Sequence, residues 1–119
     1  MDKRQDFTDA EKLALTRASY VIRELGELSE TITIPMVELL FMVAMNPGYG
    51  PQEYARRLDT LAPTLSNRLS ILGQKKHRGE DPYDLVQEGP SLGDPRGKGF
   101  YLTTRGKSLM RRIIKAQGV

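Results

Sequence analysis

The sequence contains no cysteine and a single histidine, His77. Without cysteine the chain can form neither disulfides nor thiolate metal sites, and it cannot sense redox conditions through a thiol. His77 has no partner histidine or carboxylate cluster at metal-ligand spacing, so neither a metal site nor another cofactor is expected. A nucleophile elbow and paired catalytic carboxylates are also missing, which argues against an enzyme.

Long apolar runs are absent too. The longest, Met36 to Met45, is interrupted by Glu38 and is too short to span a bilayer, so no membrane partner is expected. The first residues, Met1 to Asp9, are too polar for a secretory signal, which predicts a cytoplasmic location. The length predicts a single domain, residues 1–119, small enough to favour dimerisation.

Charge is low overall but unevenly distributed. Residues 1–67 hold 7 Lys and Arg against 10 Asp and Glu, whereas residues 68–119 hold 11 against 5. The basic second half favours a polyanionic partner, although a solvated basic face would explain the same charge.

The stretch Ala62 to Lys76 has the most informative pattern. Leu61, Leu65, Leu69 and Leu72 recur at helical spacing and predict one apolar stripe. The opposite face is short, uncharged and rich in hydrogen-bonding groups, which suits it to read base edges in a DNA major groove. A short helix and a tight turn precede this stretch, so residues 51–78 have the form of a helix-turn-helix.

The N-terminal region predicts a long helix over residues 8–29. It starts with Thr8-Asp9-Ala10-Glu11, which has the form of a capping box. A narrow apolar seam follows, which could dock on the domain's own core or on a second copy, and we expect the second copy. The residues expected to mediate dimerisation are Ala14, Ala18, Val21, Leu25, Leu28, Ile113 and Ile114.

The remaining elements are a core helix, a hairpin and a closing helix. Pro35 begins an almost wholly apolar helix that ends before Asn46-Pro47-Gly48. Tyr83 to Gln87 and Gly99 to Thr103 alternate like strands, and Glu88 to Lys98 is expected to be the loop between them. The hairpin over 83–103 forms a wing, and Thr103 is expected to cap a final helix over residues 104–117.

These elements, in this order, predict a mainly α (α+β) winged helix-turn-helix with a two-stranded wing and flanking N- and C-terminal helices. Within it, Asp94-Pro95-Arg96, Leu102-Thr103 and Gly106 fit the spacing D-x-R-x5-L-T-x2-G. This motif resembles the wing signature of the MarR family of transcriptional regulators. The resemblance covers roughly residues 34–114 and, more loosely, residues 13–28.

The resemblance implies a dimeric, sequence-specific regulator of double-stranded DNA, most often a repressor, joined through its first and last helices. Arg96 is similar to the wing-tip arginine that enters the minor groove, and Asp94 to its orienting partner. Many members of the family respond to a small-molecule effector. This chain departs from the pattern by being short after Gly106 and by carrying a polar insertion, His77 to Pro82, so no particular effector is expected.

The expected DNA contacts fall into two groups. Polar side chains of the second helix of the helix-turn-helix would discriminate bases, with Asn67 the expected contact to adenine. Cationic side chains would contact phosphates or the minor groove, while Arg68 leans toward the apolar stripe. The full set is Thr64, Ser66, Asn67, Arg68, Ser70, Lys75, Lys76, Arg78, Arg96 and Lys98.

Two other interpretations of the same fold remain open. One is a winged-helix protein-interaction module that binds no DNA, because many assemblies use the fold in this way. The other is a replication or partition DNA-binding factor of a mobile element, which the small size would suit.

Overall fold

The computed structural model describes residues 6–119, which form two compact units. One unit contains the described residues up to Thr31 together with Leu109–Val119, and the other contains Ile32–Ser108. That the whole chain folds as one domain stays a prediction. Among the described residues, none of the helices combines the length and the apolar character needed to cross a bilayer.

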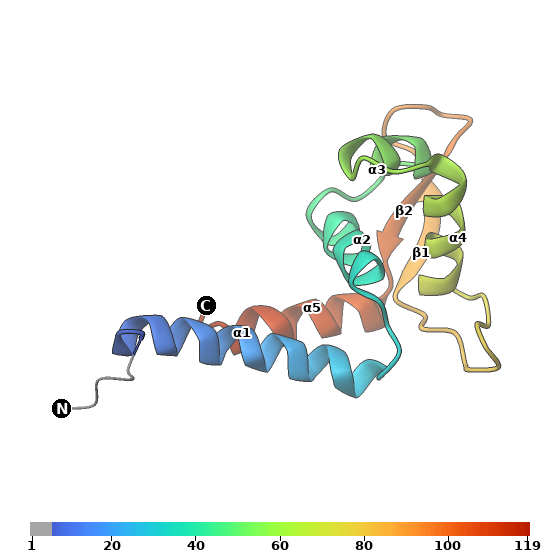
Figure 1. The fold of residues 1–119 in the computed structure, drawn as a ribbon. Helices are drawn as coiled ribbons and strands as arrows, with labels where there is room; N and C mark the ends of the chain where they lie inside the picture. Colours follow the sequence, from blue (N-terminus) through green and yellow to red (C-terminus); the bar gives the residue numbers. More distant parts are fainter. Residues whose placement is uncertain (1–5) are drawn as a thin grey trace. The chain divides into compact units, whose positions relative to one another are not determined.

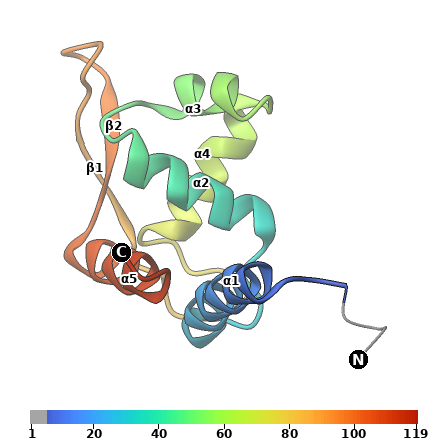
Figure 2. The same cartoon turned by 90° about the vertical axis from the view of Figure 1, so that its left-hand side faces the viewer.

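The first unit contains α1 (Asp9–Leu28) and the later part of α5 (Thr104–Ala116), which lie side by side in both Figure 1 and Figure 2. The predicted capping box is confirmed. The Thr8 hydroxyl accepts the Glu11 N–H at 3.1 Å, and the Glu11 carboxylate accepts the Thr8 N–H at 2.8 Å. These hydrogen bonds from the Thr8 backbone and side chain lower the pKa of Glu11. An ion pair of 3.0 Å between Arg112 and Glu24 links the two helices.

The second unit is built around α2 (Ile34–Met45), the predicted core helix. Thr33 caps it by accepting the Met36 N–H at 3.4 Å, and the side chains of Leu39, Leu40 and Val43 are completely buried. Next in the chain come α3 (Pro51–Arg57) and α4 (Ala62–Leu72), whose axes cross in the upper part of Figure 1. Because α3, the turn and α4 follow each other as expected, the helix-turn-helix is confirmed.

Helix α4 differs from the prediction at both ends. Leu61 precedes the first helical residue, so helical periodicity does not apply to it and its side chain is 71% exposed. Ile71, only 5% exposed, lies inward with Leu65, Leu69 and Leu72 instead. The helix also ends at Leu72 rather than Lys76, because the next part of the chain uses its last carbonyls. Asp84 and Leu85 donate their N–H groups to the carbonyls of Gly73 and Leu72, both at 2.8 Å.

The wing is an antiparallel pair of strands, β1 (Val86–Pro90) and β2 (Lys98–Leu102), with Val86 opposite Leu102 and Pro90 opposite Lys98. The bounds predicted for the first strand, Tyr83 to Gln87, are wrong: β1 begins only at Val86 and continues to Pro90. The segment Glu88 to Lys98, expected to be loop, therefore supplies strand residues at both of its ends. Tyr83 and Leu85 are buried, and the alternating apolar pattern in the sequence reflects this burial. Asp84 and Leu85 donate their N–H groups to the end of α4, and pairing with β2 begins only at Val86.

The wing is also bonded to the link between α2 and α3. Gly48 donates its N–H to the Phe100 carbonyl at 2.8 Å, and Phe100 donates its N–H to the Tyr49 carbonyl at 3.0 Å. This approach requires Gly99, because a Cβ there would lie 2.5 Å from the Gly48 carbonyl oxygen. Backbone hydrogen bonds from β2 therefore join the wing to the link before α3.

The predicted Thr103 cap of α5 is confirmed and has a second role. Its hydroxyl accepts the Gly106 N–H at 3.0 Å and donates to the Asp84 carbonyl at 2.7 Å. Gly106 leaves no room for a side chain, because its Cβ would collide with the Leu85 carbonyl. The L-T-x2-G part of the motif thus joins β2, the start of α5 and the segment before β1.

Replacing Thr103 with Val tests this junction. Thr103→Val keeps the side-chain volume but removes the hydroxyl, so it should lower the free energy of unfolding by about 1–2 kcal/mol in urea denaturation. The matched control is Thr104→Val, the same change at the next, exposed position, which should leave stability within roughly 0.5 kcal/mol. Equal effects of the two substitutions would contradict the bridging role of Thr103.

Candidate nucleic-acid interface

The exposed face of α4 carries the predicted base-reading residues. Ser66, Asn67 and Ser70 are exposed, and Thr64 is half-buried. The Ser70 hydroxyl donates to the Ser66 carbonyl at 3.0 Å, which leaves its oxygen to act as an acceptor. Arg68 is half-buried, in line with its expected lean toward the apolar side. This face offers hydrogen-bonding groups with no charge on the helix surface itself.

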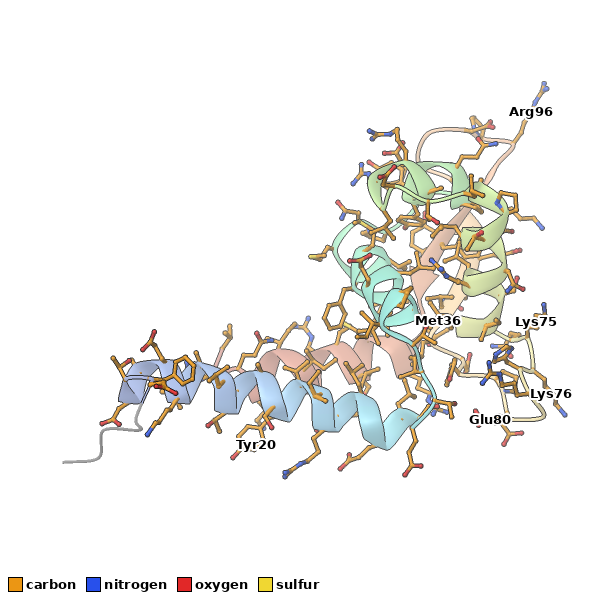
Figure 3. All side chains as sticks on the ribbon, in the orientation of Figure 1. Tyr20, Met36, Lys75, Lys76, Glu80 and Arg96 are labelled. Atoms are coloured by element: carbon orange, nitrogen blue, oxygen red, sulfur yellow. The ribbon has the colours of Figure 1, made fainter. Side chains whose placement is uncertain are left out.

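The polar insertion after α4 forms a tight basic turn. Arg78 and Gly79 both have positive φ angles, +54° and +75°, and Glu80 donates its N–H to the His77 carbonyl at 3.0 Å. Positive φ at both central positions is the pattern of a type I′ turn. Lys75 lies beside the C-terminal end of α4 and Lys76 in the loop that follows (Figure 3). These lysines and Arg78, called the basic turn below, are all exposed, and so are the acidic Glu80 and Asp81 that follow them.

The wing tip presents Arg96. Its side chain is exposed and points away from the tip in Figure 3. Asp94 orients this tip through the backbone, since its carboxylate accepts the Arg96 N–H at 2.9 Å and its carbonyl accepts the Gly97 N–H at 3.0 Å. Lys98, also exposed, forms an ion pair of 3.4 Å with Glu88 on the facing strand. Part of its charge is therefore neutralised within the wing.

Two open grooves separate the wing from α4. One, of about 610 Å³, lies between Pro63 and Ser66 near the start of α4 and Asp94 and Lys98 of the wing. The other, of about 530 Å³, lies between Ser70 and Lys75 at the end of α4 and Gln87 and Glu88 of β1. The wing and α4 thus border the same grooves, and Figure 3 shows Arg96 of the wing tip and the lysines Lys75 and Lys76 after α4 on the same side of this unit.

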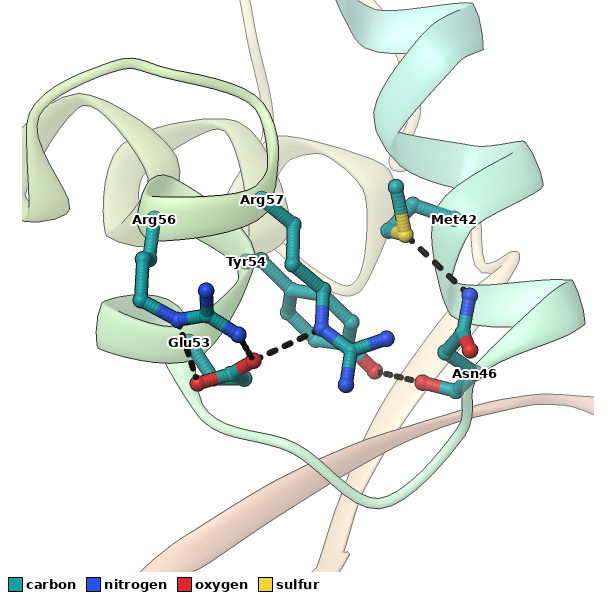
Figure 4. A network of polar contacts seen from close by, with 6 residues as sticks. All are labelled: Met42, Asn46, Glu53, Tyr54, Arg56 and Arg57. Atoms are coloured by element: carbon teal, nitrogen blue, oxygen red, sulfur yellow. Dashed lines mark hydrogen bonds and ion pairs between the residues drawn. The ribbon is translucent and has the colours of Figure 1, made fainter.

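A polar network behind this surface fixes α3, and the sequence analysis did not find it (Figure 4). Glu53 binds Arg56 and Arg57 one helical turn away, and these hydrogen bonds lower the pKa of Glu53 to about 2. The Arg57 guanidinium also lies 4.5 Å above the Tyr49 ring. The E-x-x-R-R spacing was the available signal, because residues three and four apart share a helix face.

The same network ties α3 to the end of α2. Tyr54 donates its hydroxyl to the Asn46 carbonyl at 2.6 Å, and burial raises the pKa of Tyr54 to about 12. The hydroxyl therefore stays protonated and remains a donor at any physiological pH. Asn46 in turn donates its side-chain N–H to the sulfur of Met42 at 3.2 Å. The Tyr54 hydrogen bond thus joins α3 to the end of α2.

The residues expected to mediate dimerisation are divided by the structure. Leu25 and Ile113 are buried in the single chain, and Val21 and Leu28 are half-buried, so they have little free surface. The others, Ala14, Ala18 and Ile114, are exposed. Along α1 further large apolar side chains are exposed, including that of Tyr20, labelled in Figure 3: Leu13, Leu15, Tyr20 and Ile22. That this surface joins two copies stays a prediction.

Among residues 6–119, no group of three or more His, Cys, Asp or Glu side chains is arranged to hold a metal ion.

Comparison with known proteins gives matches among solved structures. No family model matches the chain, and no curated protein matches it. The transcriptional regulator Tm0710 from Thermotoga maritima is 16% identical, with a TM-score of 0.63 over 92% of this chain and 67% of that protein. A mutant of S. aureus MepR bound to an oligodeoxyribonucleotide is 23% identical, with a TM-score of 0.61 over 92% and 76%.

The structure of MarR is also similar, at 20% identity and a TM-score of 0.59 over 99% of this chain and 76% of MarR. At such identities a likeness establishes the fold alone. The chain therefore has a winged helix fold of the kind found in MarR-type regulators, as the wing motif predicted.

Proposed function

We propose that this protein is a sequence-specific regulator of transcription that binds double-stranded DNA. In this proposal α4 enters a major groove and the wing tip enters the neighbouring minor groove. The observation that carries it is that two different surfaces border the same groove. Ser66 of the hydrogen-bonding face of α4 and Asp94 of the loop that carries the exposed Arg96 both line it, and Figure 3 shows Arg96 on the same side as Lys75 and Lys76.

Individual cations beside the polar face of α4 favour a nucleic acid over a protein partner. Lys75 and Lys76 follow the last turn of α4, and Arg96 and Lys98 lie on the wing, whereas Arg105, Lys107, Arg111, Arg112 and Lys115 of the basic half lie in α5. Among the similar proteins, Tm0710 is described as a transcriptional regulator, and the MepR mutant is bound to an oligodeoxyribonucleotide. These likenesses favour a regulator over an enzyme and over an assembly module.

Each part of the surface has its own role in the proposal. Thr64, Ser66, Asn67 and Ser70 contact base edges, whereas Lys76, Arg78 and Lys98 neutralise phosphates and supply affinity that falls with salt. Arg96 occupies the minor groove, where a narrow groove concentrates negative potential. Arg68, half-buried, contributes its charge at the edge of the helix face.

The proposal includes a dimer and repression. The first turns of α1 have no buried side chain from Asp9 to Tyr20, although they carry Leu13, Leu15 and Tyr20. Apolar surface of this kind on a helix is stabilised when a second copy covers it. A two-fold dimer would read two half-sites, and a protein bound across a promoter would block transcription.

Arg96→Ala tests the wing assignment. A duplex selected from a random pool by the wild-type protein provides the probe for fluorescence anisotropy. The substitution should weaken binding on the order of tenfold for all sequences, and it should lower the slope of log affinity against log salt by about 1, because one cation no longer displaces a counterion.

The matched control is Arg111→Ala, which removes the same charge from the exposed side of α5. It should leave both the affinity and the salt slope unchanged. Equal affinities of the wild type and Arg96→Ala would contradict the minor-groove role. Failure of the wild type to select any duplex would contradict DNA binding altogether.

Ala18→Glu tests the dimer. If α1 packs on a second copy, a carboxylate at this position becomes buried without a partner, and the dimer dissociation constant should rise by roughly a hundredfold or more in sedimentation equilibrium. Gln52→Glu adds the same charge at an exposed position of α3, outside α1, and should leave the constant unchanged. A wild-type monomer, or equal effects of the two substitutions, would contradict dimerisation through α1.

A further inference from the structure

A hydrogen bond connects the loop after α4 back to the exposed face of the helix. The Lys75 ammonium donates to the side-chain oxygen of Asn67 at 3.0 Å. The two residues are eight positions apart, too far to meet along a continuous helix. They meet because α4 ends at Leu72 and the chain reverses at Gly73.

The backbone holds Lys75 where this contact can form. Lys75 donates its own N–H to the Ser70 carbonyl at 3.0 Å, and the neighbouring Gln74 side chain donates to the Asp84 carboxylate at 2.6 Å. These two bonds hold the chain at the lysine and at the residue before it. The exposed Lys75 side chain therefore starts close to the last turn of α4.

This contact fixes the orientation of the Asn67 amide. An ammonium group has three donors and no acceptor, so only the carbonyl oxygen of the amide can face it. The NH₂ group of Asn67 consequently points the other way. The Asn67 oxygen is occupied by Lys75, and the pair offers donors from both members: the amide NH₂ and the remaining ammonium N–H groups.

We propose, on the basis of the proposed function, that Asn67 and Lys75 act as one unit that recognises guanine in the major groove. Guanine presents two acceptors there, N7 and O6, whereas adenine presents the N7 acceptor beside the N6 amino donor. A pair of donors matches guanine. An asparagine reads adenine by accepting from N6, and here that acceptor is engaged. The second lone pair of the Asn67 oxygen does not restore the match to adenine. An adenine amino group that donated to it would lie beside the Lys75 ammonium, and two hydrogen-bond donors would then face each other.

The pair therefore changes two expectations from the sequence. Asn67 was the expected adenine contact, and Lys75 was expected to bind a phosphate. In the proposed arrangement Lys75 determines base specificity, both by orienting Asn67 and by adding a donor of its own. Lys76, one residue further along, keeps the role of a phosphate contact.

The experiment is a single-base-pair scan of the selected duplex by fluorescence anisotropy, at one fixed salt concentration. It compares the wild type with Lys75→Met and Lys76→Met, which remove the same charge and keep a long side chain. The wild type should prefer guanine over adenine at one position of each half-site by roughly tenfold or more. Lys75→Met should abolish or reverse that preference, because the Asn67 oxygen becomes free to accept from N6, and it should leave the preferences at other positions unchanged.

Lys76→Met should weaken binding to all duplexes alike and retain the guanine preference. A third variant, Asn67→Ala, identifies the base pair that Asn67 contacts, because it should relax the base preference at that position. The inference would be overturned if the wild type preferred adenine there. It would also be overturned if Lys75→Met and Lys76→Met weakened binding to all duplexes alike. In either case the protein would still bind DNA, so the proposed function would stand. Absence of duplex binding by the wild type would instead overturn the proposed function and the guanine-reading pair together.

Discussion

The backbone hydrogen bonds between the wing and the rest of its unit are the constraint on which the candidate interface depends. Phe100 of β2 bonds to Gly48 and Tyr49 of the link before α3, and Leu85, just before β1, bonds to the last residue of α4. Backbone bonds fix distances between elements more strictly than side-chain packing does. Because of them, the wing and α4 cannot move apart without exposing several unpaired polar groups, each of which would be costly to bury.

Local signals predicted the elements that depend on neighbouring residues. The capping box at Thr8 and Glu11 and the cap at Thr103 depend on residues three positions away, and both are present. The end of α4 and the start of β1 could not be predicted in the same way. Both are set by a pairing between residues 72–73 and 84–85, which are separated by a turn and share no sequence pattern.

The candidate site was predictable in its residue types but not in its geometry. The polar face, the basic turn and the wing arginine could be recognised because α4 has a clear period and the wing has a spaced motif. The contact between Lys75 and Asn67 could not, since it exists only after the chain reverses at Gly73. Helical periodicity alone therefore does not show this contact, because it depends on the loop that follows the helix.

The central claim, that α4 and the wing form one DNA-contacting surface, is tested most directly by a ¹H–¹⁵N nuclear magnetic resonance titration with the selected duplex. The account predicts that amide signals of α4, of the basic turn and of residues around Arg96 shift together at the same DNA concentrations. Amide signals between Asp9 and Tyr20 should stay in place. Shifts confined to α1, with α4 and the wing tip unaffected, would contradict it.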